Sequence, residues 1–364
     1  MQQLLFKPNT NKIENIFTLE IESVLPIKDF TSIELFAGAG GLALGFEKAG
    51  FKHILLNEIN KDACKTLAHN RPEWNILEKD ISQIDFSEFL HKVDIISGGF
   101  PCQAFSYAGN KLGFEDIRGT LFFEFARAVK ETQPKVFLGE NVRGLLNHDD
   151  GKTLETMKSV LENIGYLVLE PQLLRAVNYK VPQKRERLII IGIRQDLAEK
   201  GEFVWPKAYS QMMNLKDALK KGDLYNCDVP LSEGAKYPIN KKKVLDLVPA
   251  GGYWRNLPDE IQRQYMKKSY FMGGGKTGMA RRLSWQEPSL TLTCSPSQNQ
   301  TERCHPDETR PLTVREYARI QTFPDDWEFI GSMSSKYKQI GNAVPVNLGY
   351  AIGKSLINFL NQIE

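Results

Sequence analysis

The residues most suited to chemistry stand where apolar runs end. Cys102 closes a glycine- and proline-containing loop, 98–102, that directly follows the apolar run 93–96. Strands that end in glycine-rich loops are where open α/β sheets place their ligands. Pro101 fixes the backbone just before the thiol, and a cysteine on such a loop is a candidate nucleophile, although free cysteines are usually buried and inert. The sequence therefore marks 97–106 as a candidate active-site loop.

Two more groups stand at similar places. Glu140 follows the apolar run 136–139, so we expect it at a strand end, as for Cys102. Gln183, Arg185 and Arg187 alternate with a period of two, which predicts that all three point to one face of an extended segment. A glutamate whose pKa is raised by burial can donate a proton, and the arginines suit an anionic or carbonyl-bearing ring. The same residues could also be a loop acid and surface charges.

A glycine-rich turn predicts a cofactor site. Gly38, Gly40 and Gly41 lie between an expected strand, 31–36, and an expected helix, 42–49. The glycines allow the backbone to approach a ligand at the helix N-terminus. Glu58, at the end of the next strand, could accept hydrogen bonds from ribose hydroxyls, and Asp80, after the third strand region, could meet an adenine amino group. These features predict an adenosine-containing ligand and leave a dinucleotide enzyme open.

The elements that must position these residues alternate between strand and helix up to residue 194. This order predicts an α/β fold: a doubly wound, mainly parallel sheet with helices on both faces. Periodicity is poor from 195 to about 311, which predicts a second, smaller domain rich in loops and short strands. A final helix begins at Pro345, and its apolar face is expected to dock on the first domain.

The composition is that of an ordinary globular protein. The 364 residues are 41% hydrophobic and 25% charged, and 47 basic against 44 acidic residues give a net charge of +3. This charge demands no polyanionic partner, so a nucleic-acid surface must come from local patches. There is no apolar run near the ~18 residues of a membrane span, no secretory signal, and no C-x-x-C among five cysteines. We expect a cytoplasmic protein without a metal, and no membrane partner.

The order and spacing of these blocks resemble the DNA (cytosine-5)-methyltransferases, most closely the bacterial restriction-modification enzymes. The resemblance covers most of the chain. It rests on Phe36-Ala37-Gly38-x-Gly40 with Asn57-Glu58 and Asp80, Pro101-Cys102-Gln103, Glu140-Asn141-Val142, Gln183-x-Arg185-x-Arg187, the block from Arg310 to Pro324, and Gln339-Ile340-Gly341-Asn342-Ala343-Val344-Pro345. It implies a Rossmann-like methyltransferase fold with S-adenosylmethionine as cofactor.

The resemblance also implies a reaction. The Cys102 thiolate would add to C6 of a cytosine flipped out of the duplex, and C5 would then take the methyl group. Glu140 would hydrogen-bond or protonate N3, while Arg185 and Arg187 would stabilise O2 and position the ring. Loss of the C5 proton and elimination of Cys102 would regenerate the enzyme.

The same resemblance assigns the remaining site residues. Gln103 and Ser106 are expected to contact DNA near the flipped base. The basic pairs and runs Arg281-Arg282, Lys241–Lys243 and Lys267-Lys268 are candidates for phosphate contacts, although each could be only a solvated surface. The expected cofactor contacts are Phe36, Ala37, Gly38, Gly40, Gly41, Leu42, Glu58, Ile59, Asp80, Ile81, Pro101, Leu121, Asn342 and Val344.

The resemblance divides the chain into four parts. We expect an N-terminal extension (1–29), a catalytic and cofactor-binding domain (30–194), a target-recognition domain (195–330) and a return to the catalytic domain (331–364). Double-stranded DNA is the expected partner of a monomer, and a cognate restriction endonuclease would act separately. The alternatives are an RNA cytosine methyltransferase with the same catalytic parts and a non-catalytic DNA-binding regulator.

Overall fold

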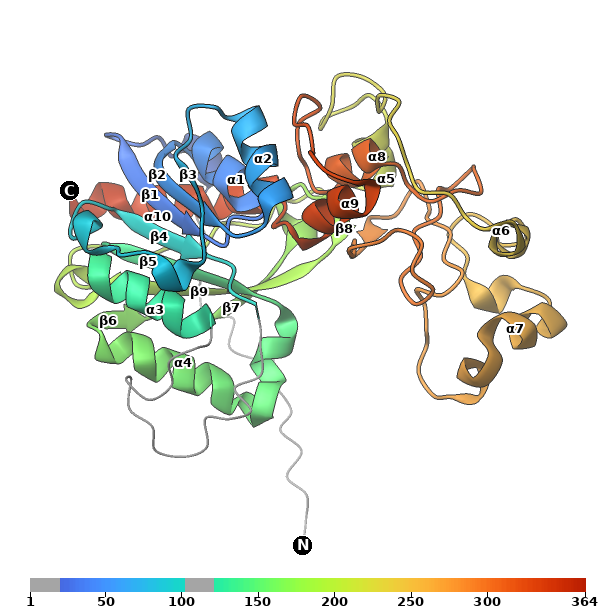
Figure 1. The fold of residues 1–364 in the computed structure, drawn as a ribbon, viewed down its shortest axis with the longest axis horizontal. Coiled ribbons are helices and arrows are strands. Elements are labelled where there is room, and N and C mark those ends of the chain that lie inside the picture. Colours follow the sequence, from blue (N-terminus) through green and yellow to red (C-terminus); the bar gives the residue numbers. More distant parts are fainter. Residues whose placement is uncertain (1–19, 102–120) are drawn as a thin grey trace, which may run out of the picture.

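The structure, a computed structural model, describes residues 20–101 and 121–364. Cys102, Gln103 and Ser106 lie outside the described residues. The central feature is an eight-stranded sheet in the order β3-β2-β1-β4-β5-β9-β6, with β7 also paired to β9 (Figure 1). Its strands are β1 (Phe30–Leu35), β2 (Phe51–Glu58), β3 (Ile76–Glu78), β4 (Ile95–Gly98), β5 (Val136–Asn141), β6 (Tyr166–Val168), β7 (Gln172–Arg175) and β9 (Glu186–Arg194).

The five N-terminal strands are parallel, and β9 runs antiparallel to its neighbours β5, β6 and β7. The prediction of a mainly parallel sheet is confirmed. The strand order reverses direction at β1, which has β2 on one side and β4 on the other. Such a switch point, at the carboxyl ends of the strands, is where open α/β sheets bind ligands.

Helices cover both faces of the sheet (Figure 1). α1 (Gly41–Ala49) and α10 (Val346–Ile363) lie on one face, and α3 (Leu121–Thr132) and α4 (Lys152–Asn163) on the other, while α2 (Lys61–Asn70) lies near β2 and β3. Side chains of β1 alternate between the two layers: Phe30 packs into the core that contains α10, and Ile33 into the core that contains α3. No described helix combines the length and apolarity needed to cross a membrane.

The contact between α1 and α10 is close because glycines stand where the helices meet. A Cβ atom on Gly45 would lie 2.6 Å from the Val346 carbonyl oxygen, and one on Gly353 would lie 2.7 Å from the Ala49 Cβ. Either methyl group would force the helices apart. The expected docking of the last helix on the first domain is thus confirmed, and it brings the chain before α10 to the start of α1.

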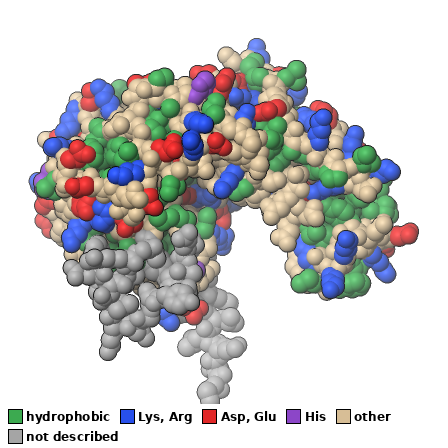
Figure 2. Space-filling model, in the orientation of Figure 1, with side chains coloured by type: hydrophobic (Ala, Val, Ile, Leu, Met, Phe, Trp, Pro, Cys, Tyr) green, Lys and Arg blue, Asp and Glu red, His purple; other side chains and the backbone are tan. Residues whose placement is uncertain are grey.

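The part of the chain after Arg194 has few regular elements, as predicted. Before α10 its helices and strand are α5 (Leu215–Leu219), α6 (Ile239–Leu245), α7 (Asp259–Met266), β10 (Ser289–Leu290), α8 (Val314–Ile320) and α9 (Met333–Asn342), beside short 3-10 turns. The expectation of several short strands was wrong, because between 195 and 330 only β10 forms, beside isolated bridges, and pairs in parallel with β8 (Gln183–Lys184). The lobe with α6 and α7 projects from the main body (Figure 1). A hollow separates this lobe from the main body (Figure 2).

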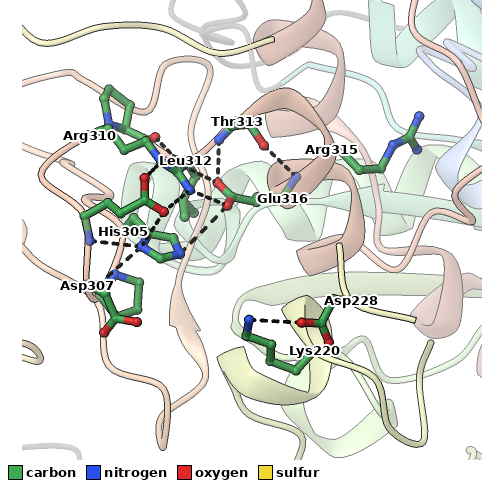
Figure 3. Close-up of polar contacts among 12 residues, drawn as sticks. Lys220, Asp228, His305, Asp307, Arg310, Leu312, Thr313, Arg315 and Glu316 are labelled. Carbon is green, nitrogen blue, oxygen red and sulfur yellow. Dashed lines mark hydrogen bonds and ion pairs between the residues drawn. The ribbon is translucent and has the colours of Figure 1, made fainter. Parts of the chain in front are cut away.

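A buried carboxylate fixes the start of α8. Figure 3 shows Glu316 between Arg310, His305 and Thr313. Arg310 donates two hydrogen bonds to Glu316, of 2.8 and 2.9 Å, and the Thr313 backbone N–H donates one of 2.6 Å. The Thr313 side chain accepts from the Glu316 N–H, which completes a capping box. Glu316 is only 3% exposed, so this satisfied charge anchors α8.

The described end of the predicted N-terminal extension belongs to the core. Ile21 and Val24 pack with α10 residues in one apolar cluster. Lys354 on α10 donates a buried hydrogen bond of 2.7 Å to the Val24 carbonyl, and Asn361 donates one of 2.9 Å to the Leu25 carbonyl. Residues 20–28 therefore pack against α10 and hydrogen-bond to it, and are not a free arm.

Candidate functional site

The glycine-rich turn between β1 and α1 adopts a strained backbone. Phe36, Gly38 and Gly40 have φ angles of +57°, +56° and +81°. A bulky residue such as Phe36 rarely adopts a positive φ, and strain of this kind concentrates at functional sites. Leu67 and Trp327 pack so closely on Gly40 that a Cβ there would lie 2.6 Å from one and 3.2 Å from the other. The packing of Leu67 and Trp327 thus holds the turn in place at the switch point of the sheet.

Glu58 lies directly beside this turn. Its carboxylate accepts a hydrogen bond of 2.7 Å from the Gly38 backbone N–H and one of 2.7 Å from the Asn60 N–H. The two bonds orient an acceptor group at the end of β2, next to the strained glycines. Ribose hydroxyls are donors that such a fixed carboxylate can bind, so the donor and acceptor set fits an adenosine-containing cofactor.

Val344, far away in sequence, also reaches this turn. A Cβ on Gly41 would lie 2.1 Å from the Val344 carbonyl oxygen, so only glycine lets the segment before α10 pack here. Asn342 is exposed beside it and accepts a hydrogen bond of 3.1 Å from the Cys294 thiol. The structure thus brings Val344 to the turn, and Asn342 lies two residues before it in the chain.

The other expected cofactor residues differ in exposure. Ile59 and Pro101 are exposed and Leu121 is half-buried. Leu42 and Ile81 are buried in the core, so their side chains are not free to meet a ligand; only their backbone is. Asp80 accepts from the Ser82 N–H and hydroxyl, at 3.0 and 2.8 Å, and these bonds lower the pKa of its carboxyl group.

Glu140 and Arg187 form a nearly buried ion pair at the carboxyl edge of the sheet. Arg187 Nε lies 2.5 Å from Glu140 Oε1, and the two side chains are 10% and 12% exposed. Burial raises the pKa of Glu140, and the positive charges of Arg187 and Arg185 oppose that rise. Neither Arg187 Nε nor Glu140 Oε1 has a hydrogen bond of good geometry in the described structure. The two atoms face each other within the ion pair, so the pair holds the two side chains together where β5 ends and β9 begins.

The backbone leading to Cys102 is tied to this acid. A Cβ on Gly99 would lie 2.8 Å from Glu140 Oε2, and Asn141 donates a hydrogen bond of 2.9 Å to the Phe100 carbonyl. The end of β4 and the end of β5 are thus fixed against each other. Residues 99–101 place the start of the predicted nucleophile loop beside Glu140.

Arg185 and Arg187 bind different partners, and a turn interrupts the extended segment that the one-face prediction assumed. The Arg185 N–H donates to the Gln183 carbonyl at 2.9 Å, a tight turn that interrupts the extended chain between β8 and β9. Arg185 is 1% exposed and donates to the carbonyls of Leu292 and Gly341, at 3.1 and 2.9 Å. It points to the C-terminal part of the chain, while Arg187 points to Glu140.

Arg282 and Lys241, two of the proposed phosphate contacts, lie inside the C-terminal lobe. Arg282 is 5% exposed and donates to the carbonyls of Val248 and Leu245, at 2.7 and 2.8 Å. Lys241 pairs with the fully buried Glu302 and donates to Ser297. Both side chains hold the lobe together, so Arg282 and Lys241 are corrected to structural roles.

Other basic residues remain available on the lobe. Arg281 is the least available of them, since its side chain is only 12% exposed and lies 3.7 Å from Glu287. Lys242, Lys243, Lys267 and Lys268 are exposed on the lobe with α6 and α7, where Lys and Arg side chains gather (Figure 2). These lysines are the better candidates for contacts to phosphate.

Sequence reasoning missed two buried polar side chains near the Glu140–Arg187 pair. Glu34 on β1 and Ser97 on β4 are register partners in neighbouring strands, and they are 2% and 0% exposed. Glu34 Oε2 and the Ser97 hydroxyl have no hydrogen-bond partner among the described residues. The one sequence signal for Glu34 is a charged residue between the apolar residues Ile33 and Leu35 of a buried strand.

A model of the family described as C-5 cytosine-specific DNA methylase matches residues 30–358. This chain belongs to that family. The Type II methyltransferase M.Eco47II of Escherichia coli is 64% identical over 365 residues, covering 100% of this chain and 85% of that protein. M.Sau96I of Staphylococcus aureus is 54% identical over 349 residues, covering 95% and 80%.

A solved structure gives the same result for the fold. The crystal structure of a putative DNA modification methyltransferase encoded within an E. coli prophage has a TM-score of 0.65 and 25% identity, covering 92% of this chain and 100% of that one. The C-5 cytosine-specific DNA methylase family is therefore established on sequence and fold, and the prediction of a DNA cytosine-5-methyltransferase is confirmed at that level.

Proposed function

We propose that this protein transfers a methyl group from S-adenosylmethionine to C5 of a flipped-out cytosine in a specific duplex DNA sequence. The buried Glu140–Arg187 pair, held against residues 99–101, is the observation that carries the proposal. The similarity to M.Eco47II and M.Sau96I, both named Type II methyltransferases, supports a modification enzyme of a restriction-modification system. The RNA methyltransferase is not favoured, because the family is described as a DNA methylase. The non-catalytic regulator is not favoured, because these relatives are named methyltransferases.

The cofactor would lie over the strained turn. When bound, S-adenosylmethionine supplies the electrophilic methyl group. Glu58, already oriented by two backbone N–H groups, would accept hydrogen bonds from the ribose, and Asp80 would meet the adenine amino group. Phe36 and the exposed Ile59, Pro101 and Asn342 would border the ligand, with Val344 packed against Gly41.

The chemistry on cytosine would come from three side chains. Cys102, outside the described residues, would add as thiolate to C6, which makes C5 nucleophilic. Glu140 would hydrogen-bond or protonate N3, a role that its raised pKa supports. Arg187 would hydrogen-bond O2 and hold the ring against Glu140. Loss of the C5 proton and elimination of the sulfur would then give 5-methylcytosine and the free thiol.

DNA would bind in the hollow between the sheet domain and the lobe with α6 and α7 (Figure 2). The cytosine must leave the stack to reach Glu140, which costs a few kcal/mol and is offset by contacts in the pocket. Gln103 and Ser106 would contact the strand around the gap, and Lys267 and Lys268 the phosphates. Residues 195–330 would read the target sequence, in a monomeric cytoplasmic protein whose cognate endonuclease acts separately.

Methyl transfer to plasmid DNA tests the proposal. The purified protein is incubated with duplex DNA and S-adenosylmethionine carrying a labelled methyl group, and the DNA is digested to nucleosides. We expect the label in 5-methyl-2′-deoxycytidine, and bisulfite sequencing should place it at one recurring sequence. Label in a methylated adenine, on the cytosine N4 atom, or only in added RNA would overturn the proposal.

A further inference from the structure

Gln183 is at the centre of a buried polar cluster between the sheet domain and the C-terminal part of the chain. It is fully buried, and both ends of its amide are used. Its Oε1 accepts a hydrogen bond of 2.9 Å from the Leu292 backbone N–H, and its Nε2 donates one of 2.8 Å to the Gln321 Oε1. Gln183 thus connects β8 to the segment after β10 and to the end of α8.

Gln321 extends this cluster toward the cofactor turn. Its Nε2 donates to the carbonyls of Ile340 and Ala343, at 2.7 and 3.2 Å, and its own carbonyl accepts from the Val346 N–H at 3.0 Å. These bonds span the end of α9, the segment that contains Val344, and the beginning of α10. The position of Val344 against Gly41 therefore depends on Gln321.

Arg185 bonds to the same two segments. One end of its guanidinium donates to the Leu292 carbonyl at 3.1 Å, and the other donates to the carbonyls of Gly341 and Asn342, at 2.9 and 3.4 Å. A forked, planar donor can bind two chain segments at once, which an ammonium group cannot do in the same geometry. Burial, and next the nearby Arg187, lower the pKa of Arg185 to about 9, so it stays charged at neutral pH.

This geometry leaves Arg185 little capacity for a substrate. Both terminal nitrogens are bonded to backbone carbonyls, and only Nε lacks a partner among the described residues. The side chain is 1% exposed, whereas Arg187, two residues further on, meets Glu140 directly. One short segment therefore carries an arginine for the reacting pocket and another for the junction between domains.

We propose that Arg185 is a positioning residue, not a contact to cytosine. With Gln183 and Gln321 it forms a junction between β9, which carries Arg187, and two segments of the C-terminal part of the chain. These are segment 340–344, on the cofactor side, and segment 289–294, on the side of the recognition domain. The inference deepens the proposed function and rests on it for the ligand used as probe. Loss of the junction releases Asn342 and Val344 from the turn, so cofactor binding weakens even when no DNA is present.

Hydrogen–deuterium exchange of the full-length protein without ligand tests the junction first. In Arg185→Met we expect at least about ten-fold faster exchange in segments 288–294 and 340–346, whose amides include Leu292 and Val346, and no change in β1 or β4. Arg185→Lys, which keeps the charge but not the fork, should give an intermediate increase and decides the question if the methionine variant does not fold. The matched control is Arg175→Met, at an exposed position on β7 of the same sheet.

Calorimetry with S-adenosylhomocysteine separates a positioning role from a substrate contact. Arg185→Met should bind it about ten-fold or more weakly than wild type, because the turn loses its neighbouring segment. The affinity of Arg185→Lys should lie between those of Arg185→Met and wild type. Glu140→Gln should bind it as wild type does. Unchanged exchange and unchanged affinity in the Arg185 variants, with turnover alone lost, would overturn the inference. A wild-type protein that methylates no DNA would refute the proposed function but leave the exchange result valid.

Discussion

The backbone of Gly99 lies so close to Glu140 that a methyl group on Gly99 would stand 2.8 Å from the carboxylate Oε2. This contact joins the stem of the predicted nucleophile loop to the predicted acid. The distance is well inside van der Waals contact, so either the loop or the carboxylate must move when a side chain is added. Gly99 is therefore part of the site although it has no side chain to react.

Gly99→Ala should reduce methyl transfer by on the order of 10²-fold, because displacement of a reacting group by about 1 Å has such effects. Folding should be nearly unchanged, since Gly99 is not in the core of the sheet. Single-turnover rates and thermal melting measure the two separately. Gly222→Ala is the control, as no atom lies within 4 Å of its Cβ position. Wild-type rates in Gly99→Ala would show that the contact has no role.

Glu140→Gln should lower the single-turnover rate about 10²- to 10⁴-fold, the usual contribution of a positioned acid or base. Its effect on duplex affinity, measured by gel shift, should be small. Burial raises the pKa of Glu140, so its protonated form persists to higher pH than that of an ordinary glutamate. The wild-type rate should fall as pH rises through this raised pKa, and the glutamine variant should lack that fall. The same fall in both proteins would assign it to another group.

Glu34→Gln should make the protein more stable, and the gain should grow with pH. Burial raises the pKa of Glu34 well above its ordinary value, and the charges of Glu140 and Glu58 add to the rise. Above pH 4.5 the folded protein keeps a proton that the unfolded chain has lost, so the free energy of unfolding falls until the raised pKa is passed. Each unit of increase in this pKa corresponds to about 1.4 kcal/mol.

Urea unfolding of Glu34→Gln and wild type at pH 5 and pH 8 tests this prediction. The amide can still accept the backbone hydrogen bond from Ala43 that the carboxylate has. The difference in unfolding free energy should be larger at pH 8. An equal difference at the two pH values would mean that Glu34 is charged throughout.

Glu58→Ala should weaken S-adenosylhomocysteine binding about ten-fold or more, as it removes an acceptor that two backbone N–H groups orient and leaves those groups without it. Asp80→Ala should have a smaller effect, because the bonds of Asp80 are local to Ser82. Calorimetry without DNA gives both affinities. Equal, wild-type affinity in both variants would place the cofactor elsewhere.

Much of the sheet domain could be predicted because its signals are local. The apolar run before Glu58 and the glycine after Ala49 predicted a strand and a helix end, and Gly50 indeed has a φ of +117°. The glycine turn stands between a strand and a helix as predicted, at the switch point that the strand order reveals. These features depend on a few neighbouring residues, so the sequence alone determines them.

The roles of the arginines could not be predicted, because they depend on distant carbonyl groups. A period of two assumes an extended chain, and the turn at Arg185 breaks that assumption. Arg282 resembles a surface charge in the sequence, yet the fold of the C-terminal lobe surrounds it with the acceptors of Val248 and Leu245. Charge pattern cannot distinguish a phosphate contact from a buried arginine.

Covalent trapping tests the central claim, that Cys102 attacks a cytosine held by Glu140 and Arg187. A duplex carrying 5-fluorocytosine in place of the target cytosine forms the adduct in the presence of S-adenosylmethionine. Its C5 carries fluorine in place of the proton that must leave before the thiol is eliminated, so the complex should persist. Peptide mass spectrometry should then find one methylated fluorocytosine on Cys102 in wild type and none in Cys102→Ala. A persistent adduct on Cys64, Cys227, Cys294 or Cys304, or methylation of ordinary DNA by Cys102→Ala at the wild-type rate, would contradict the account.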